Sequence, residues 1–143
     1  MGYDYHPCTR KKLPKKYNGV ELCYRANISG HHWLRMLLHV LGQDTTLVAV
    51  SNDGLRVPKK VAIAWGKAIL DALDKNIICE KIEKSNSIWN GSSVPYIYKP
   101  PRSKKQAFLD ALDSTNNRID EGTKEWLRGL ATMFILSGGF RQW

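Results

Sequence analysis

Apolar side chains recur at helical spacing in four segments of the chain. In the first segment, leucines follow Leu34 at i+3, i+4 and i+7, which places them on one face of a helix. The first and last segments end at glycines, which are common helix terminators. This pattern predicts helices over residues 30–41, 58–74, 104–114 and 121–136. The predicted core contains Leu37, Leu38, Trp65, Ile69, Leu130 and Phe134.

Between these segments the pattern changes to short alternating or β-branched runs. Apolar and polar residues alternate over 20–26, and residues 45–50 and 94–98 are rich in β-branched or aromatic side chains. We expect a short strand in each, whereas residues 77–82 fit either a strand or the end of the preceding helix. About four helices packed with a small sheet define an α+β domain.

The N-terminal stretch has a different character. Five Lys or Arg residues fall between Arg10 and Lys16, and Pro14 interrupts them. Proline and like-charge repulsion both disfavour a helix there. We therefore expect residues 1–19 to be a basic, irregular arm, and residues 20–143 to form a single globular domain.

The charge balance indicates the kind of partner. Of the 143 residues, 22 are Lys or Arg and 13 are Asp or Glu, which gives a formal net charge of +9. A surplus of this size attracts anionic small molecules or nucleic acid. A generally basic surface that favours solubility is the alternative.

Other global features narrow the class of protein. The three cysteines are scattered, which does not suggest a disulfide framework. Charged residues and histidines interrupt the longest apolar stretches, and the N-terminus has no apolar signal core. We expect a cytoplasmic protein without a membrane partner, whereas homo-oligomerisation stays open.

A candidate binding site lies where the expected strand at 20–26 meets the first helix. We expect Ser29 to cap that helix, because the N–H groups at a helix N-terminus bind anions. Arginines can add bidentate phosphate contacts, and histidine or tryptophan rings can stack on a base. The first wall of the predicted site comprises Arg25, Asn27, Ser29, His31, His32, Trp33 and Arg35.

The start of the second helix supplies the other wall of the predicted site. Arg56, Lys59 and Lys60 follow a turn-forming segment, and a turn rich in N–H groups beside cations can hold phosphate. We expect the two helix starts to converge, although antiparallel packing would separate them. The ordinary alternative is a capped helix with Trp33 in the core and both histidines at the surface.

The sequence contains no recognisable catalytic pattern. It lacks a phosphate-loop motif, a nucleophile elbow and a dinucleotide fingerprint, and no histidine follows His39 to complete a His-Asn-His nuclease arrangement. The histidines and cysteines match no zinc-ligand spacing. We therefore predict a protein that is not an enzyme, with no catalytic residues, no metal and no cofactor.

Three short tags suggest a relationship. Tyr-Arg-Ala-Asn-Ile at 24–28, Ser-Asn-Asp-Gly at 51–54 and Ser-Gly-Gly-Phe at 137–140 resemble a family of small uncharacterised proteins encoded by bacteriophages and prophages. That group has no assigned activity, so no functional residues carry over. The resemblance implies a phage or bacterial origin and, for a phage protein, a location in the host cytoplasm.

These observations favour a non-enzymatic binding protein for an anionic ligand, most of all a nucleotide signal. By analogy with small phage proteins that sequester such signals, it would act against host defence. The first alternative is a nucleic-acid-binding accessory protein that uses the basic arm and a helix. The second alternative is an inhibitor that binds a protein of the host defence.

Overall fold

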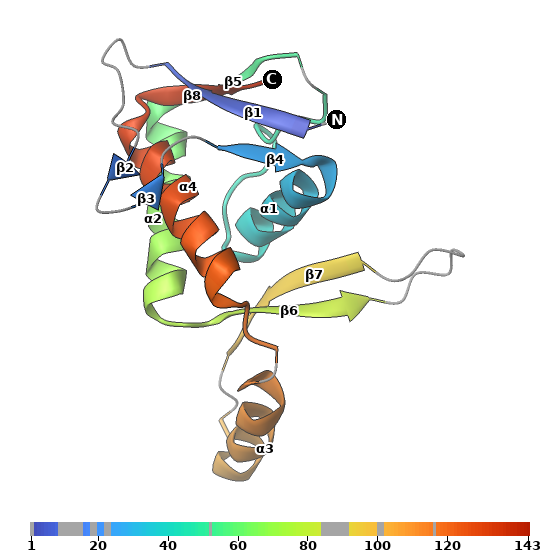
Figure 1. The fold of residues 1–143 in the computed structure, drawn as a ribbon. Helices are drawn as coiled ribbons and strands as arrows, with labels where there is room; N and C mark the ends of the chain where they lie inside the picture. The colour runs from blue at the N-terminus through green and yellow to red at the C-terminus, as the bar shows by residue number, and fades with distance from the viewer. Residues whose placement is uncertain are drawn as a thin grey trace.

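Four short strands from distant parts of the chain form one antiparallel sheet (Figure 1). They are β1 (Gly2–Pro7), β4 (Arg25–Asn27), β5 (Leu55–Pro58) and β8 (Gly139–Gln142). Their order is β4-β1-β8-β5, so β1 and β8 pair at the centre and β4 and β5 form opposite edges. The computed structural model describes residues 2–8, 16–17, 20–21, 24–51, 53–83, 92–99, 102–115 and 117–143.

All four predicted helices are present, and each begins and ends within two residues of its predicted bounds. They are α1 (Ile28–Val40), α2 (Lys59–Asp74), α3 (Lys104–Thr115) and α4 (Glu121–Leu136). Helices α2 and α4 pack against each other on one side of the sheet, whereas α3 lies at the far end of the molecule (Figure 1). The predicted α+β class is confirmed. Among the described residues, no helix has the length and apolar character to cross a bilayer.

Two hairpins complete the described structure. Strands β6 (Ile78–Glu83) and β7 (Ser92–Ile97) pair with each other, as do β2 (Lys16–Tyr17) and β3 (Val20–Glu21). The segment at 77–82, which fitted either a strand or the end of a helix, is a strand, because β6 covers most of it. Strand β7 confirms the strand predicted near 94–98. The expected strand at 20–26 is divided between β3 and β4, and residues 22–23 lie outside the described residues.

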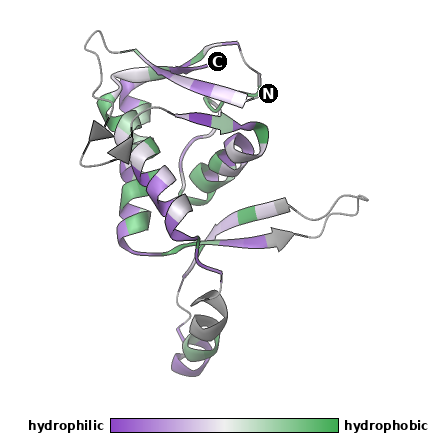
Figure 2. Cartoon of the chain, viewed as in Figure 1, coloured by the Kyte–Doolittle hydropathy of each residue, from purple (hydrophilic) through white to green (hydrophobic). Residues whose placement is uncertain are grey.

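The core lies where α1, α2 and α4 meet the sheet. All six predicted core residues are buried, with at most 2% of any of them exposed. Phe134 and Phe140 stack with ring centroids 4.4 Å apart, and Tyr5 and Trp65 pack against both rings. Figure 2 shows hydrophobic and hydrophilic residues alternating along α2, as expected for a helix with one buried face.

Helices α2 and α4 approach each other closely at Gly66. A Cβ atom on Gly66 would lie 2.6 Å from the Ala131 carbonyl oxygen and 2.6 Å from Cγ1 of Ile135. Glycine in a helix interior normally costs about 0.5–1 kcal/mol relative to alanine. At Gly66 the better helix propensity of alanine is outweighed by the steric clash with the α4 backbone, because the two helices would have to separate to make room for a Cβ atom.

We predict that Gly66→Ala lowers the free energy of unfolding by about 1–3 kcal/mol, as measured by urea denaturation. Gly122→Ala is the matched control, because Gly122 is exposed in the first turn of α4 and its Cβ would meet only the Asp120 carboxylate at 3.5 Å. The control should be neutral or slightly stabilising. A stabilising Gly66→Ala would contradict the close packing of α2 on α4.

The strand predicted at 45–50 is wrong, because this segment forms turns. Side chains from distant elements take the place of a neighbouring strand. His31 Nε2 donates to the Ala49 carbonyl oxygen, and Arg35 donates to the Val48 carbonyl oxygen. Gln142 accepts from the Ala49 N–H at 2.9 Å and donates to the Leu47 carbonyl oxygen at 2.8 Å. Among the β-branched residues of this segment Val48 is buried and Val50 is 79% exposed, so their presence marks neither a strand nor a buried run.

Part of the predicted N-terminal arm also differs from expectation. Residues 2–7 form β1 at the centre of the sheet, with Tyr3 and Tyr5 buried and their neighbours directed outward. This alternation over Tyr3 and Tyr5 is a strand pattern, which the adjacent basic run obscured. Residues 10–15 of the basic run lie outside the described residues, and Lys16, its last member, is in β2.

Candidate functional site

The N-terminal half of α1 borders a cleft of about 830 Å³. Strand β4 and α1 form one side, and the β6–β7 hairpin and the first turns of α4 form the others (Figure 1). Six of the ten predicted binding residues line this cleft: Arg25, Asn27, Ser29, His32, Trp33 and Arg35. The lining also includes Ala26, Gly30, Met36, Glu80, Ser93, Thr123 and Trp126.

Asn27 caps α1, which is the role predicted for Ser29. Strand β4 runs directly into the helix, and the Asn27 side-chain oxygen accepts a hydrogen bond from the Gly30 N–H at 2.7 Å. Ser29 lies in the first turn and is exposed. The first turn of a helix leaves four N–H groups without an acceptor inside the helix. The cap binds one of them, so the start of α1 still favours an anion.

Two arginines bring positive charge to this side of the cleft. Arg25 pairs with Asp4 at 3.4 Å, and the Arg25 side chain is 71% exposed, so this pair is weak and leaves most of the guanidinium accessible. Arg35 is half-buried and anchored through its bond to Val48. Its Nε atom is buried and has no hydrogen-bond partner among the described residues.

Two tryptophans line the cleft, and they differ in how much of the ring is exposed. Trp33 is 9% exposed, and its indole N–H has no hydrogen-bond acceptor among the described residues. A buried donor without a partner is costly, and this nitrogen has almost no accessible surface, so a ligand would reach it only after the surrounding side chains move. Trp126 of α4 is only partly buried and presents a second ring to the cleft.

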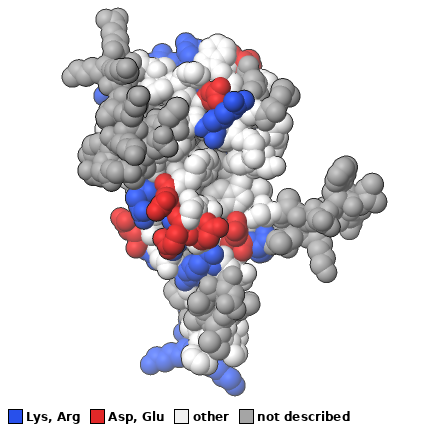
Figure 3. Space-filling model, viewed as in Figure 1, with Lys and Arg blue, Asp and Glu red and all other residues white. Residues whose placement is uncertain are grey.

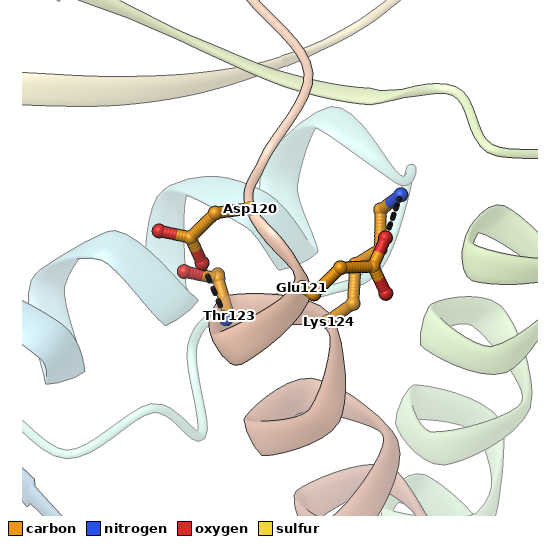
Figure 4. Close-up of polar contacts among 4 residues, drawn as sticks. All are labelled: Asp120, Glu121, Thr123 and Lys124. Carbon is orange, nitrogen blue, oxygen red and sulfur yellow. Dashed lines mark hydrogen bonds and ion pairs between the residues drawn. The ribbon is translucent and has the colours of Figure 1, made fainter.

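The side of the cleft formed by the β6–β7 hairpin carries one carboxylate, whereas α4 contributes the uncharged residues Thr123 and Trp126. Glu80 supplies that carboxylate and accepts a hydrogen bond from the Ser93 hydroxyl at 2.8 Å. Asp120 caps α4 by accepting from the Thr123 N–H at 2.7 Å, and this bond lowers the pKa of the Asp120 carboxyl (Figure 4). Figure 3 shows acidic side chains gathered across the middle of the face of the molecule that is in view. The cleft is therefore not uniformly positive.

Beside Asp120, the first turn of α4 contains a second carboxylate. Glu121 forms an ion pair with Lys124 at 3.2 Å, which partly offsets its charge (Figure 4). Both acidic residues are favourable at a helix N-terminus.

His31 belongs to the core and does not line the cleft. Only 2% of its surface is exposed, and its ring stacks on Tyr3 with centroids 3.7 Å apart. Its Nε2 donates to the Ala49 carbonyl oxygen at 2.7 Å, so Nδ1 of the neutral ring accepts from the Tyr5 hydroxyl at 2.8 Å. Burial lowers the pKa of His31, helped by the charge of Arg35, and burial raises the pKa of Tyr5. With both nitrogens bonded, His31 has no free atom for a ligand.

The second predicted wall does not reach the cleft. Arg56 is on β5, at the edge of the sheet opposite β4, and pairs in register with Arg141. Lys59 and Lys60 begin α2 at the end of that strand. Strands β1 and β8 lie between the two helix starts, so the structure does not bring the predicted walls together.

The hairpin and α4 residues of the cleft were missed by the sequence analysis. Glu80 and Ser93 come from two strands of a hairpin and are 13 positions apart, so no local motif marks them. Trp126 follows the apolar spacing of α4, and that spacing alone does not distinguish a cleft residue from a core residue. Its position in the first turns of that helix, before the buried stretch that starts at Leu127, is the one signal for partial exposure.

Comparisons with known proteins do not assign the cleft a function. No protein-family model, curated protein or solved structure matches the chain. Within the described part of the chain, no three His, Cys, Asp or Glu side chains gather as ligands for a metal ion. The function is therefore inferred from the residues of the cleft.

Proposed function

We propose that the protein binds a small anionic molecule of the nucleotide class in the cleft at the start of α1. The observation that carries the proposal is that a helix N-terminus, Arg25 and Arg35 meet two tryptophans in one cleft. Its volume of about 830 Å³ lies in the usual range of small-ligand sites, roughly 300–1,000 Å³. A phosphate suits the helix start, and a base suits an aromatic ring.

The role we propose is binding without chemical conversion. Of the two histidines at the start of α1, His31 is fully bonded inside the core, and His32 is the one that lines the cleft. A protein of this kind acts by lowering the free concentration of its ligand. Together with the resemblance to phage proteins, this supports the sequestering of a nucleotide signal in the host cytoplasm.

Replacing Arg25 tests the site. Arg25→Ala should weaken nucleotide binding about ten- to a hundredfold, because it removes a charge-assisted contact worth roughly 1.5–3 kcal/mol. The measurement is titration calorimetry with linear and cyclic nucleotides. Stability should change by less than about 1 kcal/mol, because the Asp4 pair is exposed.

The matched control is Arg56→Ala, which removes the same charge at the opposite edge of the sheet. Its affinity should equal that of the wild type. An equal loss of nucleotide affinity in both variants would mean that the net positive charge of the whole protein, and not the cleft, attracts the ligand. Tight binding confined to long nucleic acid, and steeply lost with added salt, would favour a nucleic-acid-binding function instead.

One further observation supports protein binding as a second candidate function. Helix α3 exposes Phe108 by 66% and Leu109 by 50%. Beside them, Arg102, Lys104 and Lys105 are also exposed, and basic side chains are visible at the outer end of this helix (Figure 3). An apolar pair flanked by cations suits a partner protein with an acidic rim. Loss of partner binding in Phe108→Ser, with nucleotide affinity unchanged, would establish it.

A further inference from the structure

The two sides of the cleft differ in charge and in chemistry. Arg25 comes from β4 and Glu80 from β6, and these strands lie on opposite sides of α1 (Figure 1). The β4 side combines cations with a helix start, whereas the β6 side presents a carboxylate. A ligand with phosphate along its whole length would meet repulsion at Glu80. The complementary ligand is anionic at one end and rich in hydrogen-bond donors at the other.

Glu80 is held in position to accept such donors. The Ser93 hydroxyl donates to Oε2 of Glu80 at 2.8 Å, across the two strands of the hairpin. The Glu80 backbone N–H donates to the Asn117 carbonyl oxygen at 2.8 Å, which fixes the strand beneath the side chain. A carboxylate has about four acceptor sites, so the bond from Ser93 leaves the Glu80 carboxylate with free ones facing the cleft.

We infer that Glu80 is the specificity residue of the cleft and accepts the ribose hydroxyls of a ribonucleotide, an inference that rests on the proposed function. The ribose carries two neighbouring hydroxyl donors, which match the two oxygens of one carboxylate. With the phosphate at the start of α1, the sugar would reach towards β6, and the base would lie against Trp126. Because Trp33 is almost fully buried, it offers little ring surface for stacking, and Trp126 is the more exposed of the two rings.

A site with Glu80 in this role would distinguish ribonucleotides from dideoxynucleotides, although the two carry the same charge. A ribonucleoside monophosphate satisfies both sides of the cleft. A 2′,3′-dideoxynucleotide of the same base keeps the phosphate and loses both donors, so the Glu80 carboxylate would keep its bond from Ser93 and lose the two from the ribose. Sites built to bind a hydroxyl discriminate strongly against ligands that lack it.

The test compares these two ligands by calorimetry on the full chain. The probes are the ribonucleoside monophosphate that binds best among the four common bases and its 2′,3′-dideoxy counterpart. We expect the wild type to prefer the ribonucleotide at least about tenfold. In Glu80→Ala this ratio should fall to near one, while the dideoxynucleotide binds as well as before or better. Ser93→Ala should give an intermediate ratio.

Glu125→Ala provides the matched control. It removes an exposed carboxylate from α4 that does not line the cleft, so the preference for ribose should persist. A wild-type ratio near one, or an unchanged ratio in Glu80→Ala, would overturn the role of Glu80. If nucleotides still bind and Arg25→Ala still weakens them, the proposed function stands. If no nucleotide binds the wild type, the proposed function fails and this inference fails with it.

Discussion

Replacing His31 with alanine is expected to lower the free energy of unfolding by about 3–5 kcal/mol. The change removes a buried ring that stacks on Tyr3 and leaves a cavity at the junction of β1 and α1. It also leaves the Tyr5 hydroxyl and the Ala49 carbonyl oxygen without their partner, and each unsatisfied buried group costs about 1–3 kcal/mol. Urea denaturation followed by circular dichroism measures the loss.

The neighbouring histidine serves as the control. His32 is exposed and lines the cleft, so His32→Ala should change stability by less than about 0.5 kcal/mol and act on nucleotide affinity instead. The two adjacent histidines thus separate the structural role of His31 from the binding role proposed for His32. Similar stability in the two variants would contradict the placement of His31 in the core.

Because His31 is buried, the free energy of unfolding is expected to depend on pH. The pKa of His31 is lowered in the folded protein, so between that value and about 6.5 the unfolded chain binds more protons than the folded one. The stabilising contribution is therefore complete above about pH 6.5 and is lost as the pH falls towards the folded pKa. His31→Gln should lack this part of the pH dependence. An identical pH profile in the variant and the wild type would contradict it.

Gln142→Ala is expected to cost about 2–4 kcal/mol in the free energy of unfolding. Gln142 is 1% exposed and joins β8 to the segment at 45–50 through the Ala49 N–H and the Leu47 carbonyl oxygen. Its amide also donates to the Leu55 carbonyl oxygen at 3.3 Å. Alanine leaves these backbone groups inside the protein without partners. Thermal and urea denaturation would both report the loss.

Arg141→Ala is the matched control on the same strand. Arg141 is exposed and donates one bond, at 3.2 Å, to the Gly54 carbonyl oxygen. Its replacement should cost less than about 1 kcal/mol. If Gln142→Ala were as mild as this control, the segment at 45–50 would have to be held by other contacts.

Helix positions were predictable because their signals are local. The apolar spacing of α4 and the glycines after it define its bounds, and Gly138 adopts a positive φ of 69° just beyond its last turn. The buried faces followed from the same spacing. Such signals depend only on residues within a few turns of one another, so no knowledge of the tertiary fold is needed.

Features that depend on distant partners were not predictable. The segment at 45–50 is bonded by His31, Arg35 and Gln142, the last of them 93 positions from Ala49. The start of α1 was predicted to bind an anion from local sequence, and six of the predicted residues line the cleft. The approach of Glu80 from a separate hairpin depends on the fold, as does the separation of Arg56 from Arg25.

The most direct test of the cleft as the nucleotide site uses the tryptophan indole signals in NMR. Trp33 and Trp126 line the cleft, whereas Trp65 is buried between α2 and α4 and Trp143 packs on Gly54 at the other edge of the sheet. Signals can be assigned with single Trp→Phe variants. During titration with a ribonucleoside monophosphate, we predict shifts of the Trp33 and Trp126 signals while those of Trp65 and Trp143 stay in place. Saturable binding that shifts Trp143 and leaves Trp33 and Trp126 unchanged would contradict a nucleotide site in this cleft.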